Sequence, residues 1–376
     1  MIPSINIENS LKIIEAGSEI DTKWENFISK NSESTIYHHP EWFKALKSEY
    51  NQEIIRLVCQ DKEGEIKGVM PITFTKGFPF GLGGLPAVKR LSSLPRTPIG
   101  GPISFDEKAK KLLLEAAVQK LKEKKDYTLQ IKSMDPKLNE LVNSLVALPW
   151  RLSYIKNLPN DPEKLRFGNS RNHSRIKWSI NKAIKSGVEI KCAESEEELK
   201  KWFVLYNATM RWHVVPSRSY RFFKGLWDSM KPKGLMTLLL AVQKNAEREK
   251  ILAGSVILKY NKTVFYAFNG RDENELAHRP NELIQWHAMN DSINEGYSVY
   301  DLGEVASDNE GLDKFKSKWD CEIQQLYHYY YPRPMSNNYQ NMEIDIGKFS
   351  NIKKSIWQNL PLGVTTKISD LVYRYL

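Results

Sequence analysis

The stretch YDLGEVASDNEGLDKFKSKW, residues 300–319, joins an apolar strand to a short helix. YDLGEV predicts a strand that ends on Asp-x-Gly, a sequence that commonly turns the chain. A polar loop follows, and GLDKFKSKW then predicts a helix that carries Phe315 and Lys316 ahead of Trp319. Because this helix begins close to a strand end, where clefts usually lie, the stretch predicts that Phe315 and Lys316 are delivered to a functional site.

The segments around this stretch predict alternating strands and helices, which is typical of an α/β fold with a mixed sheet. In the second half the predicted strands lie at 188–192, 235–243, 251–260, 263–270, 297–303 and 322–331. The predicted helices lie at 195–212, 220–230, 281–296 and 311–319. The first half shows a weaker version of the same order without a sequence repeat, so we predict two similar domains.

The composition is that of an ordinary globular protein with an excess of basic residues. The 376 residues carry a formal net charge of +10 and a pI of about 9.2, which favours phosphate groups, nucleic acid or an anionic membrane face as partners. The three cysteines are scattered and have neither disulfide nor metal-ligand spacing, so we expect a cytoplasmic protein without a metal. The longest apolar run, residues 235–242, is too short to span a bilayer.

Several segments match one known family in their order and spacing. They are IKGVMPITF at 66–74, RNHSRIKWSINKAIKSGV at 171–188, and the YDLG…FKSKW signature. On these residues the chain resembles the FemAB-like branch of the GNAT acyltransferase superfamily, over residues 15–332. The resemblance implies tandem GNAT-like domains at 1–160 and 161–332, followed by a helical tail at 333–376. It also implies a cleft between the domains and transfer of an activated acyl group to an amine.

The resemblance leaves the acyl donor open between acyl-CoA and aminoacyl-tRNA. Ordinary GNAT enzymes bind the CoA pyrophosphate with a glycine-rich loop, but here that place reads NGRDENELAHRPNEL, 269–283, which argues against the usual mode. The long helical hairpin of many tRNA-dependent members is missing too. We predict an N-acyltransferase that acts on a cell-envelope sugar or peptide precursor. The alternatives are an aminoacyl-tRNA-dependent peptidoglycan bridge transferase and a non-catalytic binder of anionic glycan or lipid.

Acyl transfer to an amine requires a cation or hydrogen-bond donor at the tetrahedral oxyanion and a route for the amine proton. Lys316 is the candidate cation, with the equal alternative that it holds a phosphate as a point charge. Phe315 is expected to line one side of the site and to restrict the access of water. Asp301 and Glu304, on either side of Gly303, are candidates to accept the proton or orient the amine. Each also has a structural explanation, such as a solvated lysine or a turn carboxylate.

The predicted helix at 171–185 is strongly basic, and Arg171, Arg175 and Lys182 are its candidate binding residues. This helix either binds an anionic donor or acceptor, such as a nucleotide-sugar, a lipid-linked precursor or tRNA, or it is an ordinary solvated face.

Four further residues are candidates for substrate binding. Tyr206 and Arg211 lie near a helix end and would line an acceptor pocket. Arg271 follows the central hairpin, and His39 belongs to a histidine pair.

The tail sequence NIKKSIWQNLPLGVTTKISDLVYRYL, 351–376, mixes basic and apolar side chains. It predicts either a helix that docks back on the protein or an amphipathic helix at the inner membrane face. Membrane contact would favour a lipid-linked acceptor.

Overall fold

The computed structural model describes residues 11–77, 89–122, 124, 126–245, 248–306, 309–332 and 351–375. Its strands are β1 (Lys12–Ala16), β2 (Ile55–Gln60), β3 (Ile66–Thr75), β4 (Lys89–Ser92), β5 (Ile103–Ser104), β6 (Tyr127–Ser133), β7 (Val146–Asn157), β8 (Val188–Cys192), β9 (Met236–Asn245), β10 (Arg248–Tyr260), β11 (Thr263–Arg271), β12 (Val299–Val305) and β13 (Glu322–Tyr331). Its helices are α1 (Asp21–Ile28), α2 (Pro40–Tyr50), α3 (Glu107–Lys122), α4 (Leu138–Leu141), α5 (Ser170–Lys185), α6 (Glu196–Trp212), α7 (Tyr220–Ser229), α8 (Pro280–Asn294), α9 (Glu310–Ser317), α10 (Asn351–Asn359) and α11 (Leu362–Tyr373). Of the predicted tail, residues 333–350 and 376 lie outside the described residues, and the rest contains α10 and α11.

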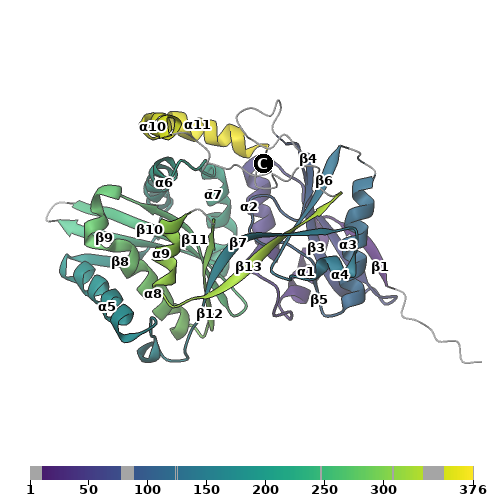
Figure 1. Cartoon of the computed structure of the whole chain (residues 1–376), viewed down its shortest axis with the longest axis horizontal. Helices are drawn as coiled ribbons and strands as arrows, with labels where there is room; N and C mark the ends of the chain where they lie inside the picture. Colours follow the sequence, from purple (N-terminus) through teal and green to yellow (C-terminus); the bar gives the residue numbers. More distant parts are fainter. Residues whose placement is uncertain are drawn as a thin grey trace, which may run out of the picture.

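One mixed sheet runs through both halves of the chain (Figure 1). The strand order is β1-β2-β3-β4-β6-β13-β7-β12-β11-β10-β9-β8, and β5 pairs with β3. Two neighbouring pairs are parallel, β4 with β6 and β11 with β12. A helical crossover joins each of these pairs, α3 in the first half and α8 in the second. The two halves therefore repeat the same parallel unit.

The two halves exchange their last strands. β7 ends the first half but lies between β13 and β12, and β13 ends the second half but lies between β6 and β7. Both strands cross the middle of the molecule in Figure 1. Side chains of β7 therefore reach elements of the second half. The domain boundary at residue 160 stays a prediction, because the sheet continues across it.

Helices cover both faces of the second half of the sheet. Successive residues of β10 enter different cores: Leu258 packs with α6 and α7, and Ile257 packs with α5 and α8. The first of these cores continues into the other half, where Trp42 of α2 meets Phe222 of α7 edge to face, with ring centroids 5.4 Å apart. α3 covers the first half of the sheet. Among the described helices, none is long and apolar enough to cross a membrane.

Candidate active site

β11 and β12 begin as a parallel pair and then separate. Their ladder ends at Phe265–Asp301, although β11 continues to Arg271 and β12 to Val305. Directly after Asp301 the register of β12 against β7 shifts, and Gly303 adopts φ +82°, a conformation that favours glycine. The Asp-x-Gly sequence therefore lies where β12 leaves β11, and the sheet opens at this point.

Lys316 of α9 lies beside this opening. Its side chain is only 5% exposed, and its Nζ donates a hydrogen bond to the backbone carbonyl of Glu304 at 3.1 Å. A methyl group on Gly303 would lie 3.5 Å from Nζ, so the glycine and the ammonium are close neighbours. Burial lowers the pKa of Lys316 to about 8, although the charges of Asp301 and Glu304 raise it. Lys316 is therefore a buried cation whose titration lies near neutral pH.

Two carboxylates accompany Lys316. Asp301 is buried, and its Oδ1 accepts hydrogen bonds from the Gly303 amide at 2.7 Å and the Ser153 hydroxyl at 2.9 Å. Burial raises the pKa of Asp301, while these hydrogen bonds and Lys316 act in the opposite direction. The other carboxylate, Glu304, is on the same strand. The structure thus brings Lys316, Asp301 and Glu304 together, and their catalytic roles stay predictions.

The two oxygens of Glu304 differ in their surroundings. Oε1 accepts a hydrogen bond from Nη1 of Arg151 at 2.6 Å. Oε2 is buried and has no hydrogen-bond partner among the described residues. An unpaired buried carboxylate oxygen is costly, so this atom is a candidate to receive a proton or a ligand group.

Sequence reasoning missed the contribution of the first half to this site. Arg151 and Ser153 both lie on β7, which reaches β12 only because of the strand exchange. Tyr37, also from the first half, is buried with its ring 5.3 Å from that of Phe265, and burial and the charges of Asp301 and Glu304 raise its pKa. The local pattern of β7 is that of any strand, so it carried no signal for these contacts.

Phe315 lies on α9 next to Lys316 but faces other aromatic and basic groups. Its ring meets Trp319 edge to face, with centroids 6.4 Å apart, and Nζ of Lys318 lies 4.2 Å from its centroid. Phe315 is half-buried. A role in walling the reaction site therefore stays a prediction.

A groove of about 1040 Å³ lies between α5 and α9. Its charged and aromatic lining consists of Arg171, Arg175, Trp178, Arg279, Glu282, Asp313, Lys314 and Lys318. Lys182 does not line it, and its Nζ lies 5.4 Å from the Trp178 ring centroid instead. Lys314 of α9 and Lys318, which directly follows the helix, line the groove, while Lys316 of α9 is buried toward the sheet. The predicted cations Arg171 and Arg175 are therefore separated from Lys316 by α9.

Two predicted binding residues are buried in the protein. Tyr206 belongs to the core, and its hydroxyl accepts a hydrogen bond from the backbone amide of Arg218 at 3.2 Å. Burial raises its pKa. His39 caps α2 by accepting from the Glu41 amide, and its Nε2 lies 3.4 Å from a carboxylate oxygen of Glu25. Both residues are buried and neither lines the groove. Their positions in the sequence did not reveal this burial.

The other two predicted binding residues hold structural contacts. Arg211 donates from Nη1 to the carbonyl of Leu360 at 2.9 Å and so connects α6 to the tail. Arg271 pairs with Glu273 at 2.8 Å, and its Nη2 lies 3.2 Å from Nε2 of His213. Substrate binding by either arginine stays a prediction.

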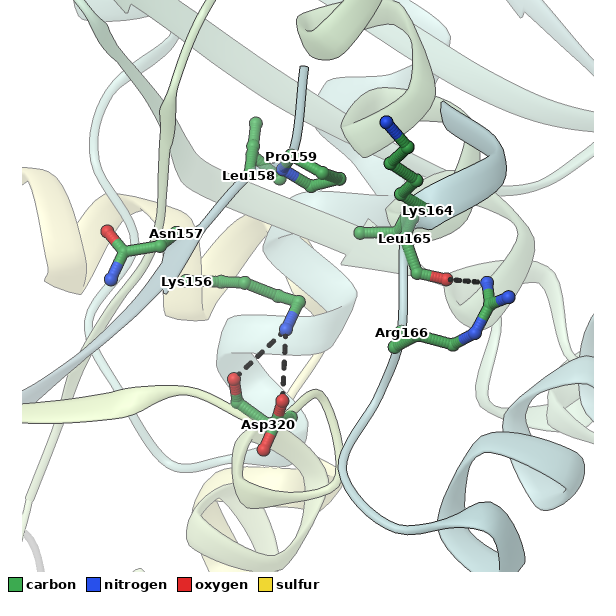
Figure 2. Close-up of a pocket in the computed structure, with 8 residues that line it drawn as sticks. All are labelled: Lys156, Asn157, Leu158, Pro159, Lys164, Leu165, Arg166 and Asp320. Carbon is green, nitrogen blue, oxygen red and sulfur yellow. Dashed lines mark hydrogen bonds and ion pairs between the residues drawn. The ribbon is translucent and has the colours of Figure 1, made fainter. Parts of the chain in front are cut away.

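A smaller pocket, of about 330 Å³, lies where β7 leaves the sheet (Figure 2). Lys156 points into it and donates to Asp320, at 3.1 Å to the carbonyl and 3.4 Å to Oδ2. Arg166 donates to the carbonyl of Leu165 at 3.1 Å. Lys156 and Arg166 thus both donate to groups of the protein itself, and none of the predicted site residues lines this pocket. Among the residues that the structure describes, no group of three or more potential metal ligands comes together.

The loop before α8 is where the resemblance places a CoA pyrophosphate. In this chain Glu282 occupies the first turn of α8, and its Oε1 lies 2.9 Å from Nζ of Lys318 and 3.8 Å from Nη1 of Arg279. A helix N-terminus attracts negative groups, and here a carboxylate of the chain, paired with these two cations, already lies in the first turn. This arrangement agrees with the lack of a glycine-rich loop.

Comparisons with known proteins cover the part of the chain that carries Asp301, Glu304 and Lys316. Residues 170–317 match the family described as acetyltransferase (GNAT) domain. Over 141 residues the chain is 25% identical to the UDP-N-acetylmuramoylpentapeptide-lysine N(6)-alanyltransferase of Weissella viridescens. This part of the chain therefore matches a GNAT acetyltransferase domain, and its likeness to the alanyltransferase agrees with the predicted resemblance to the FemAB-like branch. The match covers 36% of this chain and only 39% of that alanyltransferase, so the chain aligns with less than half of its relative.

Solved structures extend the likeness in fold to most of the chain. FemX superposes with a TM-score of 0.65 at 15% identity, over 86% of this chain and 98% of that chain. A protein of unknown function from Bacteroides thetaiotaomicron gives 0.60 at 11% identity, over 85% and 99%. A tandem GNAT protein from the clavulanic acid pathway gives 0.50 at 9% identity, over 87% and 100%. The predicted α/β architecture of GNAT-like domains is confirmed. The match of residues 170–317 to a GNAT acetyltransferase domain agrees with the predicted acyltransferase activity.

Proposed function

We propose that this chain is an N-acyltransferase that passes an activated acyl group to an amine of a cell-envelope sugar or peptide precursor. The observation that carries this proposal is the buried Lys316 ammonium where β11 and β12 separate. With its pKa lowered to about 8, Lys316 is still mostly charged at neutral pH. Away from water, a fixed cation strongly stabilises the oxyanion of a tetrahedral intermediate.

In the proposed reaction the acceptor nitrogen attacks the donor carbonyl carbon. The new C–N bond forms first and gives a tetrahedral intermediate whose oxyanion Lys316 stabilises. The bond to the leaving oxygen or sulfur breaks when this intermediate collapses. The nitrogen must lose a proton, and Oε2 of Glu304 is the proposed acceptor because it is buried without a partner among the described residues. Glu304 then returns this proton to the leaving group. Asp301 positions the Gly303 turn through its hydrogen bonds.

Two observations favour aminoacyl-tRNA over acyl-CoA as the donor. Glu282 occupies the start of α8, where a CoA pyrophosphate would compete with its carboxylate. The α5–α9 groove combines cations with Trp178, which is 57% exposed, and single-stranded nucleic acid binds to such combinations. α9 separates the groove from Lys316. The aminoacylated end of a tRNA bound in the groove must therefore pass around α9 to bring its terminal ester to Lys316.

The proposed acceptor is a nucleotide-linked or lipid-linked precursor with a free amine. By its name, the alanyltransferase relative acts on the lysine of UDP-N-acetylmuramoylpentapeptide. A formal net charge of +10 suits an acceptor that carries a diphosphate.

The test is transfer of a radiolabelled acyl group to lysine-containing UDP-N-acetylmuramoylpentapeptide. The whole protein is supplied with either alanyl-tRNA or acetyl-CoA, and the amide product is identified by chromatography and mass spectrometry. We expect product from alanyl-tRNA only. Product from acetyl-CoA only would assign the donor to CoA. No product from either donor, together with a tightly co-purifying glycan or lipid, would support the non-catalytic binder instead.

A further inference from the structure

The C-terminal helices α10 and α11 lie along the outer side of α6 and α7 (Figure 1). The inner side of α11 is fixed to the protein, because Thr365, Ser369 and Val372 are buried. Arg96 also donates from Nη1 to the carbonyl of Tyr373 at 2.5 Å. The helix pair therefore has a fixed orientation, with one side turned away from the protein.

The outer side carries large apolar side chains. Val364, Ile368 and Leu371 recur about one turn apart on α11 and are 41%, 38% and 50% exposed, and we call them the apolar stripe. Ile356 of α10 is 59% exposed. Trp212 is 53% exposed and lies beside α10, whose Gln358 donates to its carbonyl at 2.7 Å. Such a concentration of exposed apolar side chains marks an interaction surface.

Cations border the apolar stripe. Lys367 and Arg374 are exposed on α11 between and beyond the stripe residues. Arg374 and Arg221 both pair with Asp370, at 3.2 and 3.5 Å. Among the described residues of α11 and its ion-pair partners, Lys367, Arg374 and Arg221 exceed the carboxylate of Asp370, so the border of the stripe is positive.

We propose that the outer side of α10 and α11 binds the surface of an anionic lipid bilayer. In this arrangement the apolar stripe enters the boundary between headgroups and acyl chains, and Lys367 and Arg374 contact anionic headgroups. Trp212 is suited to the same boundary because indole rings favour it. Charge complementarity selects this occupant over a second copy of the chain, since two identical faces would bring their cations together.

The test is co-sedimentation of the whole protein with vesicles of phosphatidylglycerol and phosphatidylcholine, compared with phosphatidylcholine alone. The wild-type protein should bind the anionic vesicles more tightly. Replacing the stripe in the variant V364S/I368S/L371S should weaken this binding about tenfold or more, because it removes the inserted apolar surface. K367Q and R374Q should each weaken it about fivefold through the loss of one charge.

The control variant I184S/I323S replaces residues that are 52% and 58% exposed on α5 and β13. It should bind like the wild-type protein, and thermal unfolding should show that all variants fold. Equal binding by the stripe variant and the wild-type protein would overturn the proposal. So would failure of the wild-type protein to bind the anionic vesicles. A dimer in sedimentation velocity that the stripe variant dissociates, without any change in vesicle binding, would assign the surface to a second copy.

Discussion

The two halves of the chain build their parallel strand pair differently. In the first half, β4 pairs with β6 along its whole length, and β6 keeps an unbroken register with β13. In the second half, β11 and β12 part after Phe265–Asp301, and β12 shifts register against β7. The strands differ correspondingly in sequence, since β6 reads YTLQIKS and β12 reads VYDLGEV. A glycine inside a strand weakens the ladder at that point.

The helix after each parallel pair differs as well. In the second half α9 places Lys316 at the opening, whereas in the first half α4 has four residues and no lysine. The same order of elements therefore produces an open strand pair with a buried cation in one half only. A shared fold does not by itself create a site, and the glycine and the lysine distinguish the two halves.

Lys316→Met should have the largest effect on turnover, because it removes the buried cation that the second half has and the first half lacks. Turnover should fall by about 10²-fold, the scale seen when one charge-stabilising donor is lost. The fold should survive, because methionine resembles the apolar stem of lysine. Initial rates in the alanyl-transfer assay measure this effect.

Two lysines serve as matched controls for that substitution. Lys314 lines the groove on the other side of α9, and Lys137 precedes α4 in the first half. At saturating alanyl-tRNA neither substitution by Met should change turnover by more than about twofold, since neither side chain faces the strand opening. An equal loss in all three variants would mean that general basicity, and not a positioned ammonium, supports activity.

The pH dependence of stability should also single out Lys316. Between pH of about 8 and its ordinary pKa of 10.5, the unfolded chain holds the Lys316 proton while the folded protein has released it. The free energy of unfolding therefore rises with pH across this range, by an amount on the order of 3 kcal/mol for this residue. Urea unfolding at several pH values should show that the rise is smaller in Lys316→Met. If the free energy of unfolding rises equally with pH in both proteins, burial does not lower the pKa of Lys316.

Gly303→Ala should test the opening of the strand pair, with Gly296→Ala as control. Both glycines have positive φ, +82° and +86°, so each substitution should cost about 1–2 kcal/mol of stability. A methyl group at 303 would contact Lys316, whereas one at 296 would meet nothing within 4 Å. We expect turnover to fall only for Gly303→Ala, at a similar loss in melting temperature. Equal activity of the two variants would contradict a role for the opening.

Arg171→Glu combined with Arg175→Glu tests the groove. The affinity for tRNA should fall about tenfold, and the slope of log affinity against log salt should flatten by roughly 1 to 2. Lys47 and Lys111 are 53% and 52% exposed in the first half, and their reversal to glutamate should change neither quantity as strongly. Filter binding over a range of salt concentrations measures both quantities. Similar losses in the two double variants would make the basic helix an ordinary charged surface.

Among these variants, Arg271→Ala should have the smallest effect, and the quantity to measure is CoA binding. Its guanidinium already pairs with Glu273, so CoA binding measured by calorimetry should be weak in the wild-type protein and unchanged in the variant. Tight, stoichiometric CoA binding that depends on Arg271 would show that the second half retains an ordinary GNAT donor site.

The sequence by itself determined the order of elements in the second half of the chain, the turn in β12 and the helix that carries Lys316. These features depend on local rules, namely the period of apolar residues, the preference of glycine for positive φ, and side-chain capping such as that of Ser195 on α6. The meeting of Lys316 with Asp301 and Glu304 also followed, because all three lie within sixteen residues of one strand–loop–helix unit.

Only the tertiary structure decided which distant residues belong to this site and which predicted residues lie outside it. β7 was not among the predicted strands, and no local pattern says which sheet edge a strand will join, so Arg151 and Ser153 became site residues only through the exchange with β13. The face of a helix that is buried is likewise set by its neighbours. For that reason α9 separates Lys316 from the cations of α5, and Tyr206 lies in the core although it is near a helix end.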